Sequence, residues 1–171
     1  MQEPSLIFED KQLLVLEKPP GFLAQPENQK RPDIFTWAKS YLKEKWNKPG
    51  QVYLGIVQRL DLPVGGVIVF AKSSKAASRL AKQFRERTIT KKYLSVCLGE
   101  PQASEGTFED YLVRVGNKTI LSEIKDQGTK AFLKWKVIKV LRSGEDNPIS
   151  LIKIDLLTGV KHQIRAQFSS Y

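Results

Sequence analysis

The residues of this sequence best suited to chemistry lie in one short stretch of its first half. A carboxylate, Asp61, follows an arginine, Arg59, and a glycine pair, Gly65-Gly66, comes just behind them. The β-branched and aromatic run at 67–70 then predicts a short buried strand. Asp61 is therefore expected on a loop that enters a core strand, where a rigid scaffold can hold a reactive group. Taken by itself, the pattern also fits an aspartate that pairs with Arg59 or caps a turn.

The chain as a whole is basic and of ordinary globular composition. Its 171 residues are 41% hydrophobic and 27% charged, which suits one domain with a substantial core. Lys and Arg total 28 against 18 for Asp and Glu, a formal net charge of +10. Such a balance favours a polyanionic partner, because each phosphate contact releases condensed counterions. Nucleic acid is therefore preferred over the alternative that the charge only serves solubility.

Several other classes of protein and site are disfavoured. The single cysteine, Cys97, excludes an internal disulfide and indicates a reducing, cytoplasmic setting. With only one histidine as well, a zinc site is not expected, and no glycine-rich phosphate loop or metal-ligand cluster indicates a cofactor. No apolar run approaches the ~20 residues that a membrane helix needs, and Met1 leads into Gln2-Glu3-Pro4 rather than a signal segment.

Hydrophobic patterning predicts an α+β fold with a mixed, mostly antiparallel sheet and flanking helices. The helices are marked by capping residues, Asp33 and Ser73, followed by apolar positions at helical spacing. Residues 100–124 are interrupted by Gly and Pro and predict short surface hairpins. Strands are expected at 6–8, 13–16, 52–57, 67–70, 88–99, 131–141 and 149–157, helices at 33–46, at 74–84 and after Gly159, and a turn at 143–148.

Three further segments contain combinations of residues that bear on function. The first is Lys18-Pro19-Pro20-Gly21, directly after a strand. The second is the alternating run from Lys91 through Tyr93 to Gly99, and the third runs from Leu156 to Arg165 and reads Leu-Leu-Thr-Gly-Val-Lys-His-Gln-Ile-Arg. Each of them alone is a weak signal, and their order along the chain is the informative feature.

Together with Arg59-Leu60-Asp61, these segments resemble the motifs of the RluA-type pseudouridine synthases, of the RluA/RsuA superfamily. The sequence departs from the family pattern at a few positions. The family usually has His where this chain has Gln58, Thr-Ser-Gly where it has Val64-Gly65-Gly66, Ala where it has Ser95, and Arg where it has Val160.

The resemblance implies an enzyme that isomerises uridine to pseudouridine in structured ribosomal or transfer RNA, without metal or cofactor. It implies that Asp61 is catalytic, with attack at C1′ and proton removal at C2′ both open. Arg59 would help displace or replace the flipped base, Tyr93 would stack on it, and Arg165 would pair with Asp61. It further predicts a single catalytic domain over 1–171 that lacks the C-terminal portion of the fold and has no separate N-terminal RNA-binding domain, with a monomer favoured.

Two other hypotheses remain at this point. The departures at Gln58, Val64, Gly65 and Val160 lie at or beside the motifs, which is where a catalytically inactive, RNA-binding relative would change. A basic antiparallel domain that only mediates protein contacts would explain the charge but none of the motifs. The enzyme is preferred because Asp61, Tyr93 and Arg165 are all present.

Overall fold

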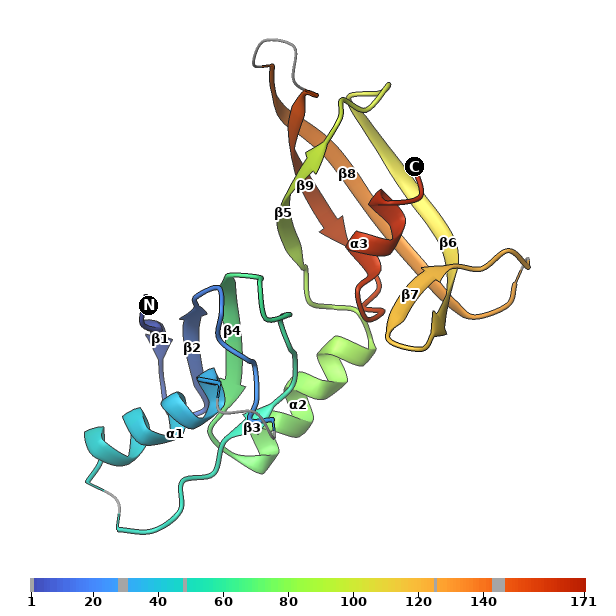
Figure 1. The fold of residues 1–171 in the computed structure, drawn as a ribbon. Coiled ribbons are helices and arrows are strands. Elements are labelled where there is room, and N and C mark those ends of the chain that lie inside the picture. Colours follow the sequence, from blue (N-terminus) through green and yellow to red (C-terminus); the bar gives the residue numbers. More distant parts are fainter. Residues whose placement is uncertain (1, 28–30, 48, 125, 143–146) are drawn as a thin grey trace. The chain divides into compact units, whose positions relative to one another are not determined.

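The computed structural model describes residues 2–27, 31–47, 49–124, 126–142 and 147–171. The chain folds into two compact units, Met1–Glu86 and Arg87–Tyr171, each with one β-sheet (Figure 1). The fold is mixed α+β with mostly antiparallel strands, as the sequence predicts. Within the described ranges, no helix is long and apolar enough to cross a membrane. Most of the predicted turn at 143–148 lies outside the described residues.

The sheet of the first unit has four antiparallel strands. They are β1 (Ser5–Glu9), β2 (Leu13–Lys18), β3 (Gly55–Ile56) and β4 (Gly66–Ala71), in the order β1-β2-β4-β3. β1 and β2 correspond to the strands expected at 6–8 and 13–16, and they pair with each other as a hairpin. β4 pairs with β2 along its whole length, so the strand that follows Asp61 is central, as expected.

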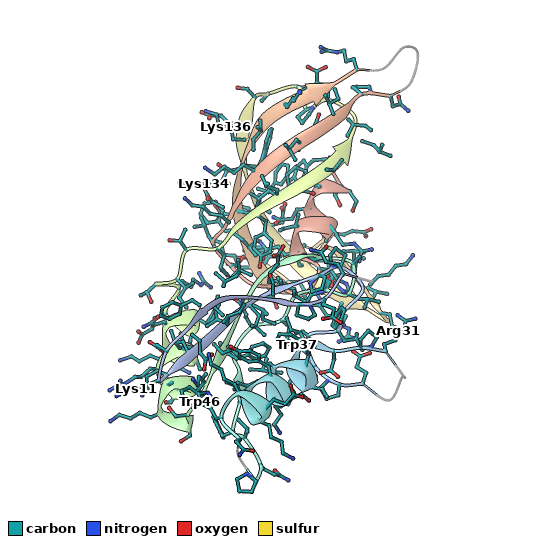
Figure 2. All side chains as sticks on the ribbon, turned by 90° about the vertical axis from the view of Figure 1, so that its left-hand side faces the viewer. Lys11, Arg31, Trp37, Trp46, Lys134 and Lys136 are labelled. Carbon is teal, nitrogen blue, oxygen red and sulfur yellow. The ribbon has the colours of Figure 1, made fainter. Side chains whose placement is uncertain are left out.

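Helix α1 (Ile34–Lys45) packs its apolar side on this sheet. Asp33 caps the helix, because its carboxylate accepts the Thr36 N–H at 2.7 Å. The aromatic residues at 37, 41 and 46 are only partly core. Trp37 and Tyr41 are stacked with ring centroids 5.7 Å apart and pack against the core, whereas Trp46 is 55% exposed (Figure 2). The buried core comprises Leu14, Leu16, Ala24, Ile34, Ala38, Leu42, Leu54, Ile68 and Phe70.

Helix α2 (Ser74–Arg85) follows β4 directly. The Ser73 hydroxyl accepts the Ala76 N–H at 3.2 Å and caps the helix, which confirms the predicted start. The helix packs against β3 and β4. A Cβ on Gly55 would lie only 2.9 Å from the Ala77 Cβ, so the close approach of helix and strand requires glycine. Ala76 is the one buried residue of α2.

The second unit is built on a five-stranded antiparallel sheet. Its strands are β5 (Lys92–Leu98), β6 (Glu105–Val115), β7 (Lys118–Leu121), β8 (Thr129–Leu141) and β9 (Ile149–Leu156), in the order β5-β9-β8-β6-β7. The register of β8 against β9 shifts between Val137 and Lys139. Lys134 and Lys136, two residues apart on β8, are both exposed (Figure 2) and give this strand a basic outer face.

The short helix α3 (Gln163–Phe168) packs on this second sheet. Ile164 and Phe168 pack against its core, so α3 is attached to the sheet through these side chains. The Phe168 and Phe108 rings meet edge to face, with centroids 5.1 Å apart. The buried core here comprises Phe108, Leu133, Trp135, Ile152, Ile154 and Leu156.

Some predicted strand boundaries are wrong. The strand expected at 52–57 is reduced to Gly55–Ile56, the part of that segment that pairs with β4. The strand expected at 88–99 covers only Lys92–Leu98. The region 100–124 contains the β6–β7 hairpin, but β6 is an eleven-residue strand rather than a short piece. Gly106 is not a break in it: a Cβ there would lie 2.7 Å from the Trp135 ring, so glycine makes room for the indole.

Candidate functional site

The Asp61 loop enters β4, as the sequence predicts. Asp61 is partly buried, and its backbone carbonyl accepts the Val64 N–H at 3.0 Å, which closes a turn. Gly66 has φ +136°, a conformation that residues with a Cβ rarely adopt. The second glycine of the motif is therefore needed by the backbone at the point where the loop becomes a strand.

Residues 18–21 pack directly against this loop. The Gly21 N–H donates to the Leu62 carbonyl at 2.9 Å. A Cβ on Gly65 would lie 3.1 Å from Cδ of Pro20, so the loop and the proline turn are in tight contact. Two motifs that are far apart in the sequence thus form one local structure in the first unit.

A fully buried lysine connects these two motifs. The Lys18 ammonium donates to the carbonyl of Phe22 at 2.7 Å, of Pro19 at 3.2 Å and of Leu62 at 3.4 Å. Burial lowers the pKa of Lys18, and the negative charge of Asp61 opposes that effect. The candidate catalytic carboxylate therefore interacts electrostatically with the lysine that holds its loop.

The two residues before the Leu60-Asp61 pair differ in their surroundings. Arg59 is exposed, so its guanidinium is accessible to a ligand. Gln58 stands where the family usually has His, and its side-chain amide donates to the Val67 carbonyl at 3.0 Å. This departure therefore has a structural role in attaching the loop to β4.

In the second unit, Tyr93 lies on β5 opposite Ile154 of β9. Its side chain is half-buried and packs against the core, on the same side of the strand as Cys97. Cys97 is a free, half-buried thiol, and the Ser95 hydroxyl lies 3.7 Å from its sulfur. Tyr93 thus combines a packed ring with partial exposure, which leaves part of it accessible.

A lysine also connects the motifs of the second unit. The Lys91 ammonium donates to the Thr158 carbonyl at 2.6 Å, and the Leu156 N–H donates to the Lys91 carbonyl at 2.9 Å. Burial lowers the pKa of Lys91, and the positive charge of Arg87 lowers it further. The segment before Tyr93 and the turn before α3 are therefore attached to each other.

A chain of polar side chains orients α3. The Thr158 hydroxyl donates to Gln163 Oε1 at 2.8 Å, and Gln163 Nε2 donates to Gln167 Oε1 at 3.1 Å. Gln167 Nε2 in turn donates to Asp110 Oδ2 at 2.7 Å, and the Tyr171 hydroxyl donates to the other Asp110 oxygen at 2.8 Å. Because buried amides are costly to leave unpaired, this chain sets the rotation of α3.

The rotation of α3 leaves Arg165 exposed. Val160, which stands where the family usually has Arg, is half-buried against Leu112, Ala131 and Ala166. This departure places an apolar side chain in a small core. A guanidinium at the same position would have to leave that core to be hydrated.

The four predicted site residues fall into two pairs. Arg59 and Asp61 lie in the first unit, beside the Lys18 turn, while Tyr93 and Arg165 lie in the second. The pairing of Arg165 with Asp61, and a common position of all four around one base, stay predictions. Among the described residues, no group of three His, Cys, Asp or Glu side chains is placed to hold a metal ion.

Sequence reasoning missed the residues that hold the motifs in place. Lys18 follows the strand predicted at 13–16 and no burial is predicted for it, yet it shares a strand face with Leu14 and Leu16, and that spacing of two indicates burial. Gln163 and Gln167 are four apart on α3, a spacing that would have indicated a shared face. No comparable local signal indicates Lys91.

The sequence also matches a known protein family and several of its members. The model of the family described as RNA pseudouridylate synthase matches residues 12–170. An uncharacterized RNA pseudouridine synthase of Mycoplasma pneumoniae is 31% identical over 160 residues, which cover 94% of this chain and 49% of that protein. A protein of Borreliella burgdorferi named ribosomal large subunit pseudouridine synthase D is 31% identical over 166 residues, with the same two shares.

The fold has counterparts among solved structures. The human RNA pseudouridylate synthase domain containing 4 protein superposes with a TM-score of 0.79 at 22% identity, over 97% of this chain and 64% of that one. This likeness shows the pseudouridylate synthase fold. The chain spans about half the length of the curated relatives it matches.

Proposed function

The chain belongs to the RNA pseudouridylate synthase family, and on that premise we propose that it isomerises specific uridines to pseudouridine in structured RNA. In this reaction the N1–C1′ bond of uridine breaks, the base turns, and a C5–C1′ bond forms. The C5 hydrogen leaves as a proton while N1 gains one, so the atoms balance without an oxidant or reductant. The observation that carries the proposal is the packing of residues 18–21 against the Asp61 loop.

Each candidate residue has one role in this reaction. Asp61 acts on the ribose or the base after the uridine has been flipped out of the RNA. Arg59, which is exposed next to it in sequence, takes the place of the base in the stack. Tyr93 stacks on the flipped uracil, and Arg165 pairs with Asp61 and keeps its carboxylate oriented.

The first RNA to test is that of the large ribosomal subunit. Support comes from two relatives that carry the name ribosomal large subunit pseudouridine synthase D, from Borreliella burgdorferi and Zymomonas mobilis, each 31% identical to this chain. Transfer RNA is the second candidate. The single cysteine supports a reducing, cytoplasmic setting for either reaction.

A catalytically inactive RNA-binding protein remains the second candidate. It is motivated by the departures from the family pattern at Gln58, Val64, Gly65 and Val160. Gln58 and Val160 nevertheless have structural partners of their own, a strand carbonyl and a small core, and this is compatible with a working site. Activity is the property that separates the two candidates.

The decisive experiment measures tritium release from ribosomal RNA labelled at C5 of uracil. Pseudouridine formation must expel this hydrogen, so we expect release with the wild type and a loss of at least about 100-fold with Asp61→Asn. Glu123→Gln, which removes an exposed carboxylate elsewhere, is the matched control and should release tritium at the wild-type rate.

The outcomes separate the hypotheses. If wild type and Asp61→Asn release tritium equally, the assignment of Asp61 is wrong. If the wild type binds ribosomal and transfer RNA but releases tritium from neither, the binding-only alternative replaces the enzyme. Circular dichroism of both variants establishes that the comparison is made between folded proteins.

A further inference from the structure

The positive charge of this chain is concentrated in one segment. Residues 72–92 contain eight basic side chains and one acidic one, which is +7 of the total +10. The remaining 150 residues therefore carry only +3. Most of this segment forms α2, in the first unit, so the general basicity of the sequence has a definite place in the fold.

Three cations of α2 form a single stripe. Lys75, Arg79 and Lys82 are all exposed, and their spacing of four and three residues puts them on one side of the helix. At a rise of 1.5 Å per residue the stripe is about 10 Å long. The only acidic residue in 72–92 is Glu86, whose carboxylate lies 3.8 Å from Lys82. We call Lys75, Arg79 and Lys82 the α2 stripe.

The helix that carries the stripe is held firmly at its N-terminal end. The Lys72 N–H donates to the Gln12 carbonyl at 2.7 Å, and the Ser73 hydroxyl contacts the Gln12 side chain at 3.1 Å. Lys72 itself pairs with Glu9 and does not belong to the stripe. Next to Gln12 in the same turn, Lys11 is exposed (Figure 2), which adds a further cation near the start of α2.

This arrangement is unfavourable for the isolated helix. Like charges at i,i+4, as in Lys75 and Arg79, destabilise a helix by a few tenths of a kcal/mol. A helix face that is merely solvated usually interleaves both signs of charge, whereas α2 has no acidic residue before its C-cap, Glu86. A bound polyanion would relieve the repulsion.

We propose that the α2 stripe binds the phosphate backbone of the substrate RNA. The inference rests on the proposed function, which supplies RNA as the partner. A lipid surface is less suitable, because membrane-bound amphipathic helices insert an apolar face. In α2 the apolar residues Ala76, Leu80 and Phe84 are buried or half-buried, so the helix has no exposed large apolar face to insert into a membrane.

The test compares two triple substitutions that remove the same charge. The stripe variant carries Lys75→Gln, Arg79→Gln and Lys82→Gln. The control carries Lys43→Gln, Lys118→Gln and Lys139→Gln, three exposed lysines on α1, β7 and β8 without an ion pair to a described residue. Binding to a fluorescent fragment of large-subunit ribosomal RNA is measured by fluorescence anisotropy. The salt concentration is varied from about 50 to about 200 mM, a range that includes the physiological ionic strength.

We expect the stripe variant to bind 10- to 100-fold more weakly at about 0.1 M salt, with a salt slope smaller by about 2, since each lost phosphate contact lowers it by about 0.7 to 0.9. The control should weaken binding by about 3-fold or less. A charge-preserving variant, Lys75→Arg with Arg79→Lys and Lys82→Arg, should bind like the wild type, and it supplies the comparison if the neutral variant does not fold.

Each other outcome overturns a separate statement. If the stripe and control variants lose RNA affinity equally, the affinity depends only on the net charge of the protein. The assignment of the binding site to α2 is then wrong. If the stripe variant loses binding to phosphatidylserine vesicles but keeps RNA affinity, the partner is a membrane. If the wild type binds no RNA at all, the proposed function fails rather than the placement of the stripe.

Discussion

In the first unit, the ammonium of Lys18 is withdrawn completely from water and donates to backbone carbonyls of the 18–22 turn and of the Asp61 loop. In the second unit, the Lys91 ammonium donates to the Thr158 carbonyl in the turn before α3, but the Lys91 side chain is only partly buried. Both lysines connect segments distant in sequence. Burial lowers the pKa of each.

The two lysines differ in the charge that lies nearby. Asp61 opposes the lowering of the Lys18 pKa, whereas Arg87 adds to the lowering of the Lys91 pKa. The negative charge of Asp61 therefore offsets part of the effect of burial on the Lys18 pKa, whereas Arg87 adds to the effect of burial on the Lys91 pKa. Because Lys18 is fully buried and Lys91 only partly, we expect the first unit to depend more strongly on its lysine than the second does on Lys91.

The largest expected effect is that of Lys18→Met, which keeps a long unbranched chain but removes the donor. The carbonyls of Pro19 and Phe22 lose their partner in a site without water access, and we expect a loss of about 3 to 4 kcal/mol in the free energy of unfolding. Urea denaturation measures it. Hydrogen exchange by mass spectrometry should place the loss of protection in β2 and β4 and leave β8 and β9 protected.

The matched control is Lys43→Met, at an exposed position of α1, which should change the free energy of unfolding by about 0.5 kcal/mol or less. A loss below about 1 kcal/mol for Lys18→Met would contradict the comparison. It would mean that these carbonyls find water or other donors when the ammonium is removed.

The sequence was most informative where local chemistry decides the structure. Asp33 and Ser73 were identified as caps because a side-chain oxygen before a periodic apolar segment satisfies the first helical N–H groups. The strand after Asp61 followed from its β-branched residues, although it is only partly buried: Ile68 and Phe70 are buried, whereas Val67 is exposed. The motifs were recognised from their residues and order, and the family comparison confirms that recognition.

The sequence was least informative where a distant partner decides the structure. Gly106 looks like a break, and only the ring of Trp135, on another strand, explains a glycine inside β6. The burial of Lys18 is indicated by its spacing from Leu14 and Leu16, but one of its hydrogen-bond acceptors, the carbonyl of Leu62, lies 44 residues away, and no local pattern reveals that contact. The roles of Tyr93 and Arg165 came from the resemblance, because no spacing along the chain relates them to Asp61.

Acid should affect the first unit before the second. Glu9 is 5% exposed and receives hydrogen bonds from Lys45 and Lys72, both at 2.7 Å, and from Trp46 and Tyr41. Burial alone would raise the pKa of Glu9, but these donors outweigh it and lower the pKa from 4.5 to about 2. The unfolded chain therefore takes up this proton first as the pH falls, and the stability due to Glu9 is lost between about 4.5 and 2.

Glu9→Gln measures this contribution. We expect the variant to be about 2 kcal/mol less stable than the wild type at neutral pH, with an upper limit of about 3 kcal/mol set by the pKa change, and the difference should vanish towards pH 2. Hydrogen exchange at pH 3 to 4, about midway through this range, should show protection lost in α1 and β2 before β8 and β9. If both units lose protection equally at this pH, the first unit is not more sensitive to acid than the second.

The smallest effect is expected from Lys91→Met. Its ammonium is only partly buried, so after substitution water can reach the Thr158 carbonyl and replace the donor. Removing the Lys91 ammonium also ends its repulsion by the positive charge of Arg87. We therefore expect a loss of about 1 kcal/mol in the free energy of unfolding, by urea denaturation, against the larger value for Lys18→Met. A loss as large as that of Lys18→Met would show that burial of the ammonium and the sign of its neighbour do not decide how strongly each unit depends on its lysine.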